Sequence, residues 1–320
     1  MLVGDVGDAA MLKRALCGVD YIFHFAAAVG VGQSMYEISR YIGTNTQGTA
    51  ELLQAMLGSR HTPEKLIVAS SMSIYGEGQY ASSGCGREAA PRVRSLAQLK
   101  TGEWELQCPT CKRTLQPMPT REDKFSDTNS VYALSKSDQE ELCLMYGRTY
   151  GIPVTSLRFF NIYGTRQALS NPYTGVAAVF AARLINGQPP LIFEDGRQMR
   201  DFVSIHDIVR AVMLAMQHSE SDGEAINIGS GHAISVMQVA ELLARALRKE
   251  SSPIITLKYR AGDIRHCYAD IAKARKLLSY EPRVTHEEGF SELAEWIAGQ
   301  HAEDKAETML NELVAYGLAV

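Results

Sequence analysis

The chain has 320 residues, of which 46% are hydrophobic and 21% are charged, so it is long enough for one large core or for two lobes. Its formal net charge of −4 gives no reason to expect nucleic acid as a partner, because such binding usually needs a basic patch. The apolar stretch 174–185 contains Arg183 and is too short for a membrane span, and residues 1–5 lack the features of a signal peptide. We therefore expect a cytoplasmic protein that binds neither nucleic acid nor a membrane.

Short apolar runs alternate with longer helical patterns along the chain. Strands are predicted at 20–25, 65–69 and 154–160, and helices at 44–58, 131–146 and 205–218. Strands that alternate with helices indicate right-handed crossovers and a parallel sheet covered on both faces. The sequence therefore predicts an α/β fold with a doubly wound, Rossmann-like sheet.

Two regions depart from this plain alternation. Residues 78–127, called the insert below, lack a clear periodicity and contain three of the six cysteines. A segment of this length is usually functional, independently folded or disordered. Helices at 236–247 and 286–297 predict a smaller C-terminal α/β lobe. We expect one domain at 1–165, interrupted by the insert, and a second lobe at 166–320, from which 202–226 returns to the first sheet.

The strongest chemical signal is the pair Tyr132 and Lys136, four residues apart on one face of a predicted helix. A lysine ammonium near a phenol lowers the pKa of the phenol, so that the tyrosine can act as a base. Taken alone, the pair is as easily an ordinary solvated helix face. Earlier in the chain, the strand at 65–69 is followed by Ser70 and Ser71 and then by Tyr75-Gly76. These serines are either part of a site or an ordinary strand end with turn-forming residues.

Together with Leu157-Arg158-Phe159-Phe160-Asn161-Ile162-Tyr163-Gly164, these segments resemble the extended short-chain dehydrogenase/reductases, and within them the NAD-dependent epimerase/dehydratase family of nucleotide-sugar enzymes. The resemblance implies that Tyr132 is the catalytic base and that Ser71 hydrogen-bonds the reacting sugar hydroxyl. It implies that Lys136 binds the nicotinamide ribose and tunes Tyr132. His24 is interpreted as a buried residue at a strand end and not as a catalytic one.

The resemblance also implies a set of binding residues and makes 1–165 the NAD-binding domain. The implied NAD contacts are Asp5, Val6, Phe25, Ala26, Ala27, Ala28, Thr44, Ser70, Tyr132, Lys136 and Phe160. The implied substrate contacts are Ser71, Tyr132, Asn161, Arg200, Arg260 and Asp263. The two arginines would clamp a nucleoside diphosphate, because guanidinium groups meet phosphate oxygens in bidentate geometry. For each arginine alone, a surface ion pair is the plain alternative.

The residues after Ser71 reduce the number of reactions that the chain is expected to catalyse. Dehydratases of this family carry acidic residues there for their additional proton transfers, whereas this chain has Met72 and Ser73. We therefore expect a 4-epimerase acting on a dTDP- or UDP-hexose. Segments 167–176 and 265–270 resemble a subgroup that includes dTDP-L-rhamnose 4-epimerases. The alternatives are a nucleotide-sugar reductase and a catalytically impaired nucleotide-sugar-binding protein. The resemblance implies a homodimer formed through the helix that carries Tyr132.

One family motif has no counterpart in the printed sequence. No Gly-x-x-Gly-x-x-Gly turn precedes Asp5, although this turn places a helix N-terminus against the cofactor pyrophosphate. Measured against the family pattern, the chain is expected to lack roughly the first fifty residues, which form the first βαβ segment. We expect the printed polypeptide to bind NAD weakly or not at all.

The insert contains Cys108-Pro109-Thr110-Cys111, a spacing typical of zinc ribbons, with Cys85 upstream. Three thiols are one ligand short of a tetrahedral site. The fourth ligand would be Glu88, a water or a more distant group. A structural zinc ion and metal-free loop cysteines both remain open; a catalytic zinc is not expected, because hydride transfer with Tyr132 needs no Lewis acid.

Overall fold

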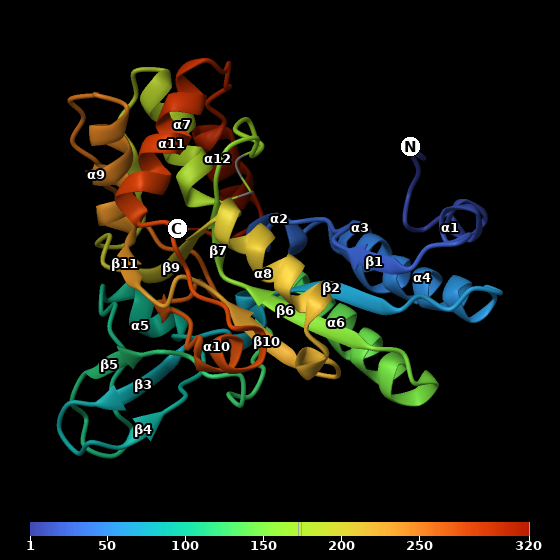
Figure 1. Cartoon of the computed structure of the whole chain (residues 1–320). Coiled ribbons are helices and arrows are strands. Elements are labelled where there is room, and N and C mark those ends of the chain that lie inside the picture. Colours follow the sequence, from blue (N-terminus) through green and yellow to red (C-terminus); the bar gives the residue numbers. More distant parts are fainter. Residues whose placement is uncertain (172, 174, 320) are drawn as a thin grey trace.

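The computed structural model describes residues 1–171, 173 and 175–319; Pro172 and Thr174, within the segment 167–176, lie outside the described residues. The central sheet is parallel and has the strand order β1-β2-β6-β10 (Figure 1). Its strands are β1 (Tyr21–His24), β2 (Lys65–Ser71), β6 (Val154–Phe159) and β10 (Ala225–Ile228). The predicted α/β fold is confirmed.

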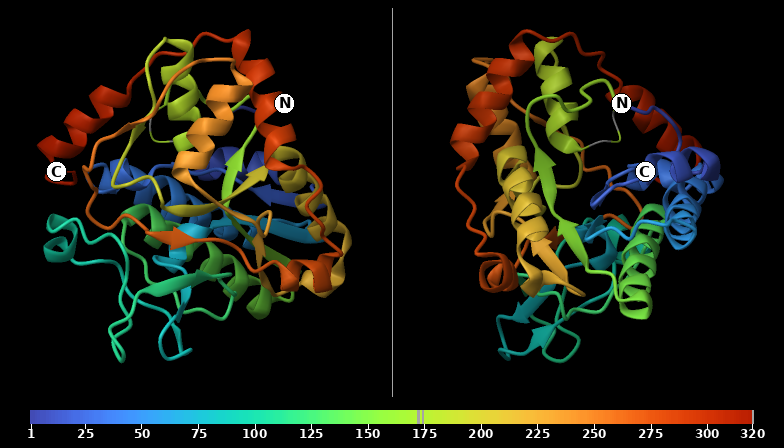
Figure 2. Two further views of the ribbon diagram at one scale, coloured as in Figure 1. Left: turned by 90° about the vertical axis from the view of Figure 1, so that its left-hand side faces the viewer. Right: turned by 45° about the vertical axis from the view of Figure 1, so that its right-hand side comes forward.

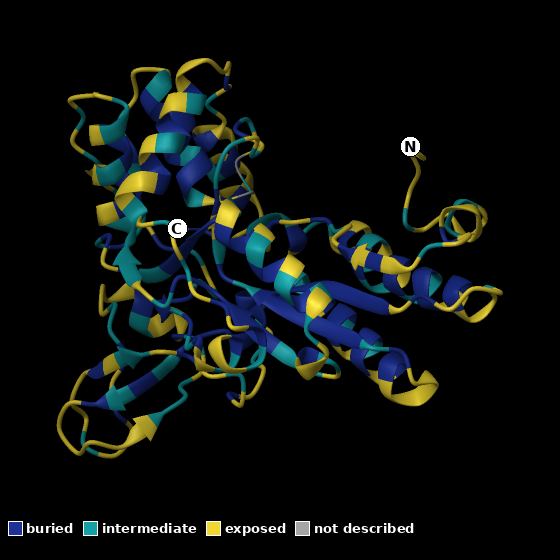
Figure 3. Ribbon diagram, viewed as in Figure 1, coloured by how far each residue is buried: buried dark blue, intermediate teal, exposed yellow. Residues whose placement is uncertain are grey.

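Both faces of this sheet are covered because its central strands are apolar on both sides. All seven residues of β2 are buried, as Figure 3 shows along the strand. Leu66 and Val68 pack towards α4 (Gly48–Leu57) and α6 (Val131–Tyr150). Ile67 packs towards α8 (Ile205–Gln217) and α10 (Ala272–Leu278) on the other face. Continuous apolar strands of this kind are typical of parallel sheets.

Helix α6 begins and ends on recognisable local signals. The Ser130 hydroxyl accepts the N–H of Ala133 at 3.1 Å, and Gly151 ends the helix in the left-handed region at φ 70°. The helix predicted at 44–58 begins differently, as a π-helical turn over Ile42–Gln47 that continues into α4. The short N-terminal helices are α1 (Ala9–Ala15), α2 (Val31–Ser34) and α3 (Ile38–Tyr41).

The second lobe surrounds a mixed sheet in which β9 (Met199–Ser204) pairs with three strands: β7 (Asn161–Tyr163), β11 (Ala233–Ser235) and β13 (His266–Cys267). Its helices are α7 (Val176–Ile185), α9 (Val236–Ala246), α11 (His286–Ala298) and α12 (Ala306–Ala315), and a short parallel pair joins β8 (Leu191–Ile192) to β12 (Ile254–Ile255). None of the helices in the described ranges is long and apolar enough to cross a membrane.

The insert is folded, although its sequence shows no clear periodicity. It contains a small antiparallel sheet with the order β4-β3-β5, built from β3 (Gln79–Ser82), β4 (Glu88–Ala89) and β5 (Leu115–Met118), and one helix, α5 (Leu96–Lys100). Strands of two to four residues are too short for an alternating pattern to be recognised. Its apolar cluster has four buried members, Tyr80, Leu106, Cys108 and Leu115.

Buried charges join the insert to the second lobe. Arg94 of the insert binds both carboxylate oxygens of Glu194, at 2.8 and 2.9 Å. Arg265, which is fully buried, also binds Glu194, at 2.9 Å, and reaches Asp195 at 2.7 Å. Its Nε and Nη2 donate to Glu105 of the insert. These residues are called the anchor cluster below.

We expect Glu194→Ala to lower the free energy of unfolding by about 3–5 kcal/mol, because it leaves two buried guanidinium groups without a shared partner. Urea unfolding followed by circular dichroism measures the change. Glu224→Gln, which removes a partly exposed ion pair with Lys273, is the matched control and should cost about 1 kcal/mol or less. Equal losses in the two variants would contradict the role given to the anchor cluster.

Candidate active site

Ser71 and Tyr132 meet at the carboxyl end of β2. Ser71 is the last residue of β2, and Tyr132 lies in the first turn of α6, which packs on that strand. Burial raises the pKa of Tyr132, and a hydrogen bond with the Ser71 side chain opposes this rise. The Ser73 hydroxyl donates to Ser71 Oγ at 2.8 Å. The phenol thus ends a short chain of hydroxyl groups.

Lys136 lies one turn further along α6 and is buried, but its ammonium group contacts a residue that the sequence analysis did not consider. Lys136 Nζ donates to Gln139 Oε1 at 2.8 Å. Burial lowers the pKa of Lys136 to about 8. Lys136 is thus directed to Gln139, and its predicted tuning of Tyr132 stays a prediction.

His24 supports this arrangement from β1. Its Nε2 lies 2.8 Å from Thr49 Oγ1 and 3.1 Å from Gln139 Nε2. Burial, with a smaller effect of the Lys136 charge, lowers the pKa of His24 to about 4, so that the ring is neutral at pH 7. His24 therefore lies behind Lys136 in the core, where its imidazole orients Gln139 and through it the lysine.

The residues predicted to contact NAD do not all lie in one place. Asp5 and Val6 precede α1, and Val6 packs against Gly48 at the start of α4. The loop after β1 leaves Phe25 and Ala26 exposed, Ala27 partly exposed and Ala28 buried, and Thr44 is partly exposed. Ser70 Oγ is buried and has no hydrogen-bond partner among the described residues. Phe160 is buried and packs against Tyr75.

A cavity of about 290 Å³ extends from this end of the sheet into the second lobe. Near the sheet it is lined by Met72, Ser73, Asn129 and Asn161, and further away by Arg200, Arg260 and Asp263. Asn161 Oδ1 has no hydrogen-bond partner among the described residues. The predicted substrate contacts other than Ser71 and Tyr132 therefore share one cavity, and Ser73 links it to Ser71.

Asp263 brings the two arginines together. Its carboxylate accepts from Arg260 Nη2 at 2.9 Å and lies 3.5 Å from Arg200 Nη2. Burial opposes ionisation of Asp263, but Arg260, Arg200 and Arg94 hold the pKa of its carboxyl below the ordinary value. Arg260 also lies over the Phe193 ring at 5.1 Å. Asp263 thus orients both guanidinium groups at one end of the cavity.

The C-terminal helix covers the cavity and connects the two halves of the chain. Met309, Leu310 and Leu313 of α12 line the cavity. Tyr316, just after the helix, stacks on Tyr36 with ring centroids 4.4 Å apart, and Figure 2 shows this helix beside the N-terminal segment. A Cβ at Gly32 would lie 2.9 Å from Leu313 Cδ2, so α12 packs closely on α2 at this point.

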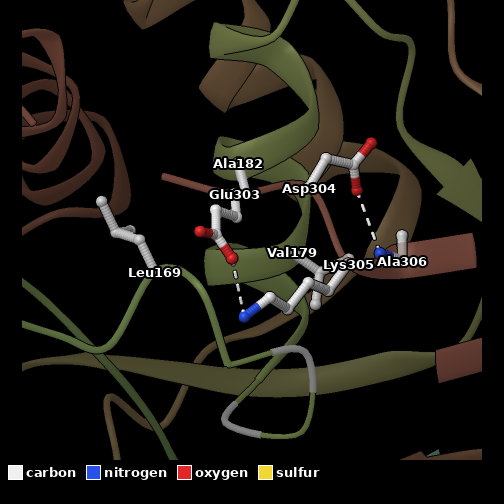
Figure 4. Close-up of a pocket in the computed structure, with 7 residues that line it drawn as sticks. All are labelled: Leu169, Val179, Ala182, Glu303, Asp304, Lys305 and Ala306. Carbon is white, nitrogen blue, oxygen red and sulfur yellow. Dashed lines mark hydrogen bonds and ion pairs between the residues drawn. The ribbon is translucent and has the colours of Figure 1, made fainter. Parts of the chain in front are cut away.

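The start of α12 is fixed by Asp304, as Figure 4 shows. Asp304 Oδ1 accepts the N–H of Ala306 at 3.0 Å, and its other oxygen accepts from Arg183 at 2.9 Å. The hollow beside these residues measures about 10 Å³, which is room for about one water molecule. These contacts of Asp304 attach the start of α12, and the hollow beside them is too small for a second binding site.

In the insert, the three predicted thiol ligands come together. The Sγ atoms of Cys85, Cys108 and Cys111 all lie within 4.8 Å of one another. Among the described residues, Glu88 is not part of this group. Its carboxylate is therefore too far from the three thiols to bind the same metal ion.

Residues 1–95 and 109–229 match the NAD dependent epimerase/dehydratase family. The chain belongs to this family. It is 32% identical over 301 residues to dTDP-L-rhamnose 4-epimerase of Burkholderia thailandensis, which covers 93% of this chain and 81% of that protein. The insert residues 96–108 fall outside the family match.

Solved structures of the family share the fold. UDP-glucose 4-epimerase of Thermotoga maritima, solved with UDP-glucose, aligns with a TM-score of 0.75 and 30% identity over 92% of this chain and 83% of that chain. A UDP-glucuronic acid 4-epimerase variant from Bacillus cereus, solved with a fluorinated UDP-sugar and NAD, aligns with a TM-score of 0.73 and 25% identity over 93% and 81%. These similarities support the α/β fold and the family resemblance that the sequence indicates.

The sequence analysis missed two parts of this site. Gln139 lies three residues after Lys136, a helical neighbour position that indicates contact. The apolar residues of α12 that line the cavity have helical spacing, but the same pattern is usual for a helix that packs on a core. Only the folded chain shows that α12 closes a cavity.

We expect stability to depend on the protonation of His24. The imidazole has a pKa of about 4 in the fold and an ordinary value of about 6.5 when unfolded, so its contribution is complete above pH 6.5 and is lost as the pH falls through 4. The free energy of unfolding should fall by up to about 3 kcal/mol over this window. Urea unfolding at a series of pH values measures it. His24→Gln should flatten this part of the profile and His301→Gln, at an exposed position, should not. An unchanged slope in His24→Gln would refute the prediction.

Proposed function

We propose that the protein is an NAD-dependent nucleotide-sugar 4-epimerase. The observation that carries this proposal is the chemistry of the cavity wall. Among the described residues that line the cavity, the single carboxylate is Asp263, and its charge is bound by Arg260 and Arg200. The positions after Ser71 are Met72 and Ser73. A dehydratase needs further acid and base groups near the sugar, whereas oxidation and reduction at C4 need one proton transfer.

Tyr132 is the group proposed to exchange the proton of the sugar 4-hydroxyl. Its phenol lies beside Ser71, and the Ser73 hydroxyl extends the same chain towards the cavity. In its phenolate form Tyr132 would accept the proton of the 4-hydroxyl while the hydride leaves C4, which makes Tyr132 a neutral phenol and the sugar a ketone. Return of the proton accompanies reduction of the opposite face after the keto sugar has turned in the cavity. Ser71 holds the oxygen in position during both steps.

The residues at the carboxyl end of β2 fit the nicotinamide end of NAD. Ser70 Oγ is a buried hydroxyl without a partner among the described residues, and Lys136 is a buried cation held by one amide. Lys136 would bind the nicotinamide ribose, and Tyr132 and Ser70 would border the ring. NAD, when bound, supplies the acceptor and donor of the hydride at C4. The predicted NAD contacts at Asp5, Val6, Phe25–Ala28, Thr44 and Phe160 stay predictions.

The substrate is proposed to be a dTDP- or UDP-hexose. Arg200 and Arg260 lie at the end of the cavity away from Ser71, where a diphosphate would reach when the sugar lies beside Tyr132. Two guanidinium groups held by one carboxylate are preorganised for phosphate oxygens. Asn161, with its unpartnered Oδ1, is placed to hydrogen-bond the sugar or the diphosphate between the two ends. A 4-epimerase for dTDP-L-rhamnose is the relative described above with 32% identity.

Three features remain predictions from the sequence: the cytoplasmic location, the homodimer through α6, and the division into an NAD domain at 1–165 and a substrate lobe at 166–320. A homodimer through α6 would use the side of the helix that leaves Leu134 and Met145 exposed. A structural zinc ion in the insert is separate from the reaction, because proton transfer by Tyr132 and hydride transfer at C4 need no Lewis acid.

A solvent-isotope experiment tests the reaction type. The protein is incubated in D₂O with saturating NAD and with dTDP-L-rhamnose, UDP-glucose or UDP-glucuronic acid. We expect a product epimeric at C4 without carbon-bound deuterium, because the hydride removed from C4 is the hydride returned. Mass spectrometry and proton NMR measure both properties.

The other outcomes each contradict the proposal in a defined way. Deuterium on a sugar carbon would indicate dehydration or epimerisation beside the ketone. Net formation of one NADH per keto sugar released would indicate a reductase that runs in reverse. Binding of a UDP-sugar in equilibrium dialysis without turnover would indicate a nucleotide-sugar-binding protein.

Tyr132→Phe tests the assigned base. We expect it to lower the epimerisation rate by about 10²–10⁴-fold, because it removes the proton carrier and leaves the ring in place. Binding of the nucleotide sugar, measured by equilibrium dialysis, should be retained. Tyr150→Phe, on the exposed end of the same helix, is the matched control and should keep the full rate. A Tyr132→Phe rate within about tenfold of the unmodified protein would remove Tyr132 from the catalytic role.

A further inference from the structure

Two turns in the insert have the same backbone conformation. The first turn spans residues 82–87 and the second spans residues 108–113. In each turn the fifth residue has a positive φ, 68° at Gly86 and 61° at Lys112. The second turn has Cys108 at its first position and Cys111 at its fourth. The first turn has Ser82 and Cys85 at the same two positions.

The backbone hydrogen bonds of the first turn define this conformation. The N–H of Ser82 donates to the carbonyl of Arg87 at 2.9 Å, and the N–H of Gly86 donates to the carbonyl of Ser82 at 3.0 Å. The N–H groups of Gly84 and Cys85 both donate to Ser82 Oγ at 3.3 Å. The side-chain oxygen of Ser82 is thus held at the inside of the turn.

The second turn repeats these bonds with sulfur in place of oxygen. The N–H of Cys108 donates to the carbonyl of Arg113 at 2.8 Å, and the N–H of Lys112 donates to the carbonyl of Cys108 at 3.0 Å. The Cys108 thiol receives hydrogen bonds from the N–H groups of Cys111 and Thr110. Ser82 therefore occupies in the first turn the place that Cys108 occupies in the second.

The side chains of the two turns converge on one point between them. Cys85 Sγ lies 3.8 Å from Cys108 Sγ, and Ser82 Oγ lies 3.0 Å from Cys111 Sγ. A tetrahedral zinc site has Zn–S bonds of about 2.3 Å, so its sulfur atoms lie about 3.8 Å apart. The Cys85–Cys108 separation equals this edge of the tetrahedron and is far longer than a disulfide bond, which is about 2.0 Å.

The size of the insert gives a physical reason for such a site. The insert extends away from the main sheet at the lower left of Figure 1, and its own buried apolar cluster has four members. One of these is Cys108. Small folded units with few buried side chains are usually stabilised by a disulfide or a metal ion. The anchor cluster holds the base of the insert through Arg94 and Glu105 but does not reach the two turns.

We propose that Ser82, Cys85, Cys108 and Cys111 form a tetrahedral structural site for Zn²⁺, in which three thiolates bind the ion and the Ser82 hydroxyl, or a water held by it, takes the fourth position. The sequence analysis found the three thiols and missed Ser82, because serine is not among the usual zinc ligands. The equal spacing of Ser82-x-x-Cys85 and Cys108-x-x-Cys111 is the signal that the sequence contains.

The test uses the full chain, reduced and freed of metal by dialysis against a chelator. Titration with Co²⁺ should produce the visible absorption of a tetrahedral thiolate complex at one equivalent, and Zn²⁺ should displace it. Binding should raise the Tm of the chain, because the site is formed in the folded state only.

Matched variants locate the ligands. Ser82→Cys should tighten Zn²⁺ binding by about tenfold or more and shift the Co²⁺ spectrum, because thiolate is a softer ligand than a hydroxyl. Cys111→Ser should weaken binding by at least as much. Cys17→Ser, at an exposed thiol outside the insert, should change neither property.

Ser82→Cys replaces an oxygen ligand by a thiolate and leaves the three cysteine ligands in place, so it decides the matter even when Cys111→Ser fails to fold. The proposal is overturned by less than about half an equivalent of bound Zn²⁺ in the reduced chain. It is equally overturned by a disulfide between Cys85 and Cys108 in place of metal, or by an unchanged affinity in Ser82→Cys.

Discussion

The anchor cluster is the interaction on which the arrangement of this molecule depends. Arg265 is fully buried and binds three carboxylates, those of Glu194, Asp195 and Glu105. A guanidinium group withdrawn from water costs several kcal/mol unless nearly all its donors are paired. These partners come from the second lobe and from the insert, so the arginine is stable there when both segments are in place. The cluster therefore fixes the position of the insert against the second lobe.

This constraint reaches the active site along the chain. Glu77 lies six residues after Ser71, is fully buried near Arg94, and accepts the N–H of Arg265 at 2.8 Å. Burial raises its pKa, and the Arg94 charge opposes that rise. On the other side, the residues just before Arg265 include Ile264, whose carbonyl accepts from Arg200, and Asp263. The segment that follows Ser71, at the proposed sugar end of the cavity, and the segment around Asp263, at the proposed diphosphate end, are thus both bound to the anchor cluster.

Burial also determines the chemistry around Tyr132. Burial shifts the pKa of each titratable group in the site: it raises the pKa of Tyr132, lowers that of Lys136 to about 8, and lowers that of His24 to about 4, so that His24 is neutral at pH 7. A hydrogen bond between Ser71 and the phenol and a hydrogen bond from Lys136 to Gln139 pair these groups inside the fold. A pocket of low polarity strengthens the electrostatic interactions that act during proton transfer.

The sequence by itself determined the alternation of strands and helices and the α/β fold, because apolar periodicity is a local property. Its resemblance to a known family pointed to Ser71, Tyr132 and Lys136. It also placed Cys85, Cys108 and Cys111 in one segment. The tertiary structure alone decided that Lys136 contacts Gln139, that α12 closes the cavity, that Phe160 faces the core, and that Ser82 completes the thiol cluster. The contacts of α12 and Phe160 join residues far apart in the chain, whereas Gln139 and Ser82 are residues of unremarkable type at common spacings. Packing of the whole fold selects these contacts among the many that local spacing allows.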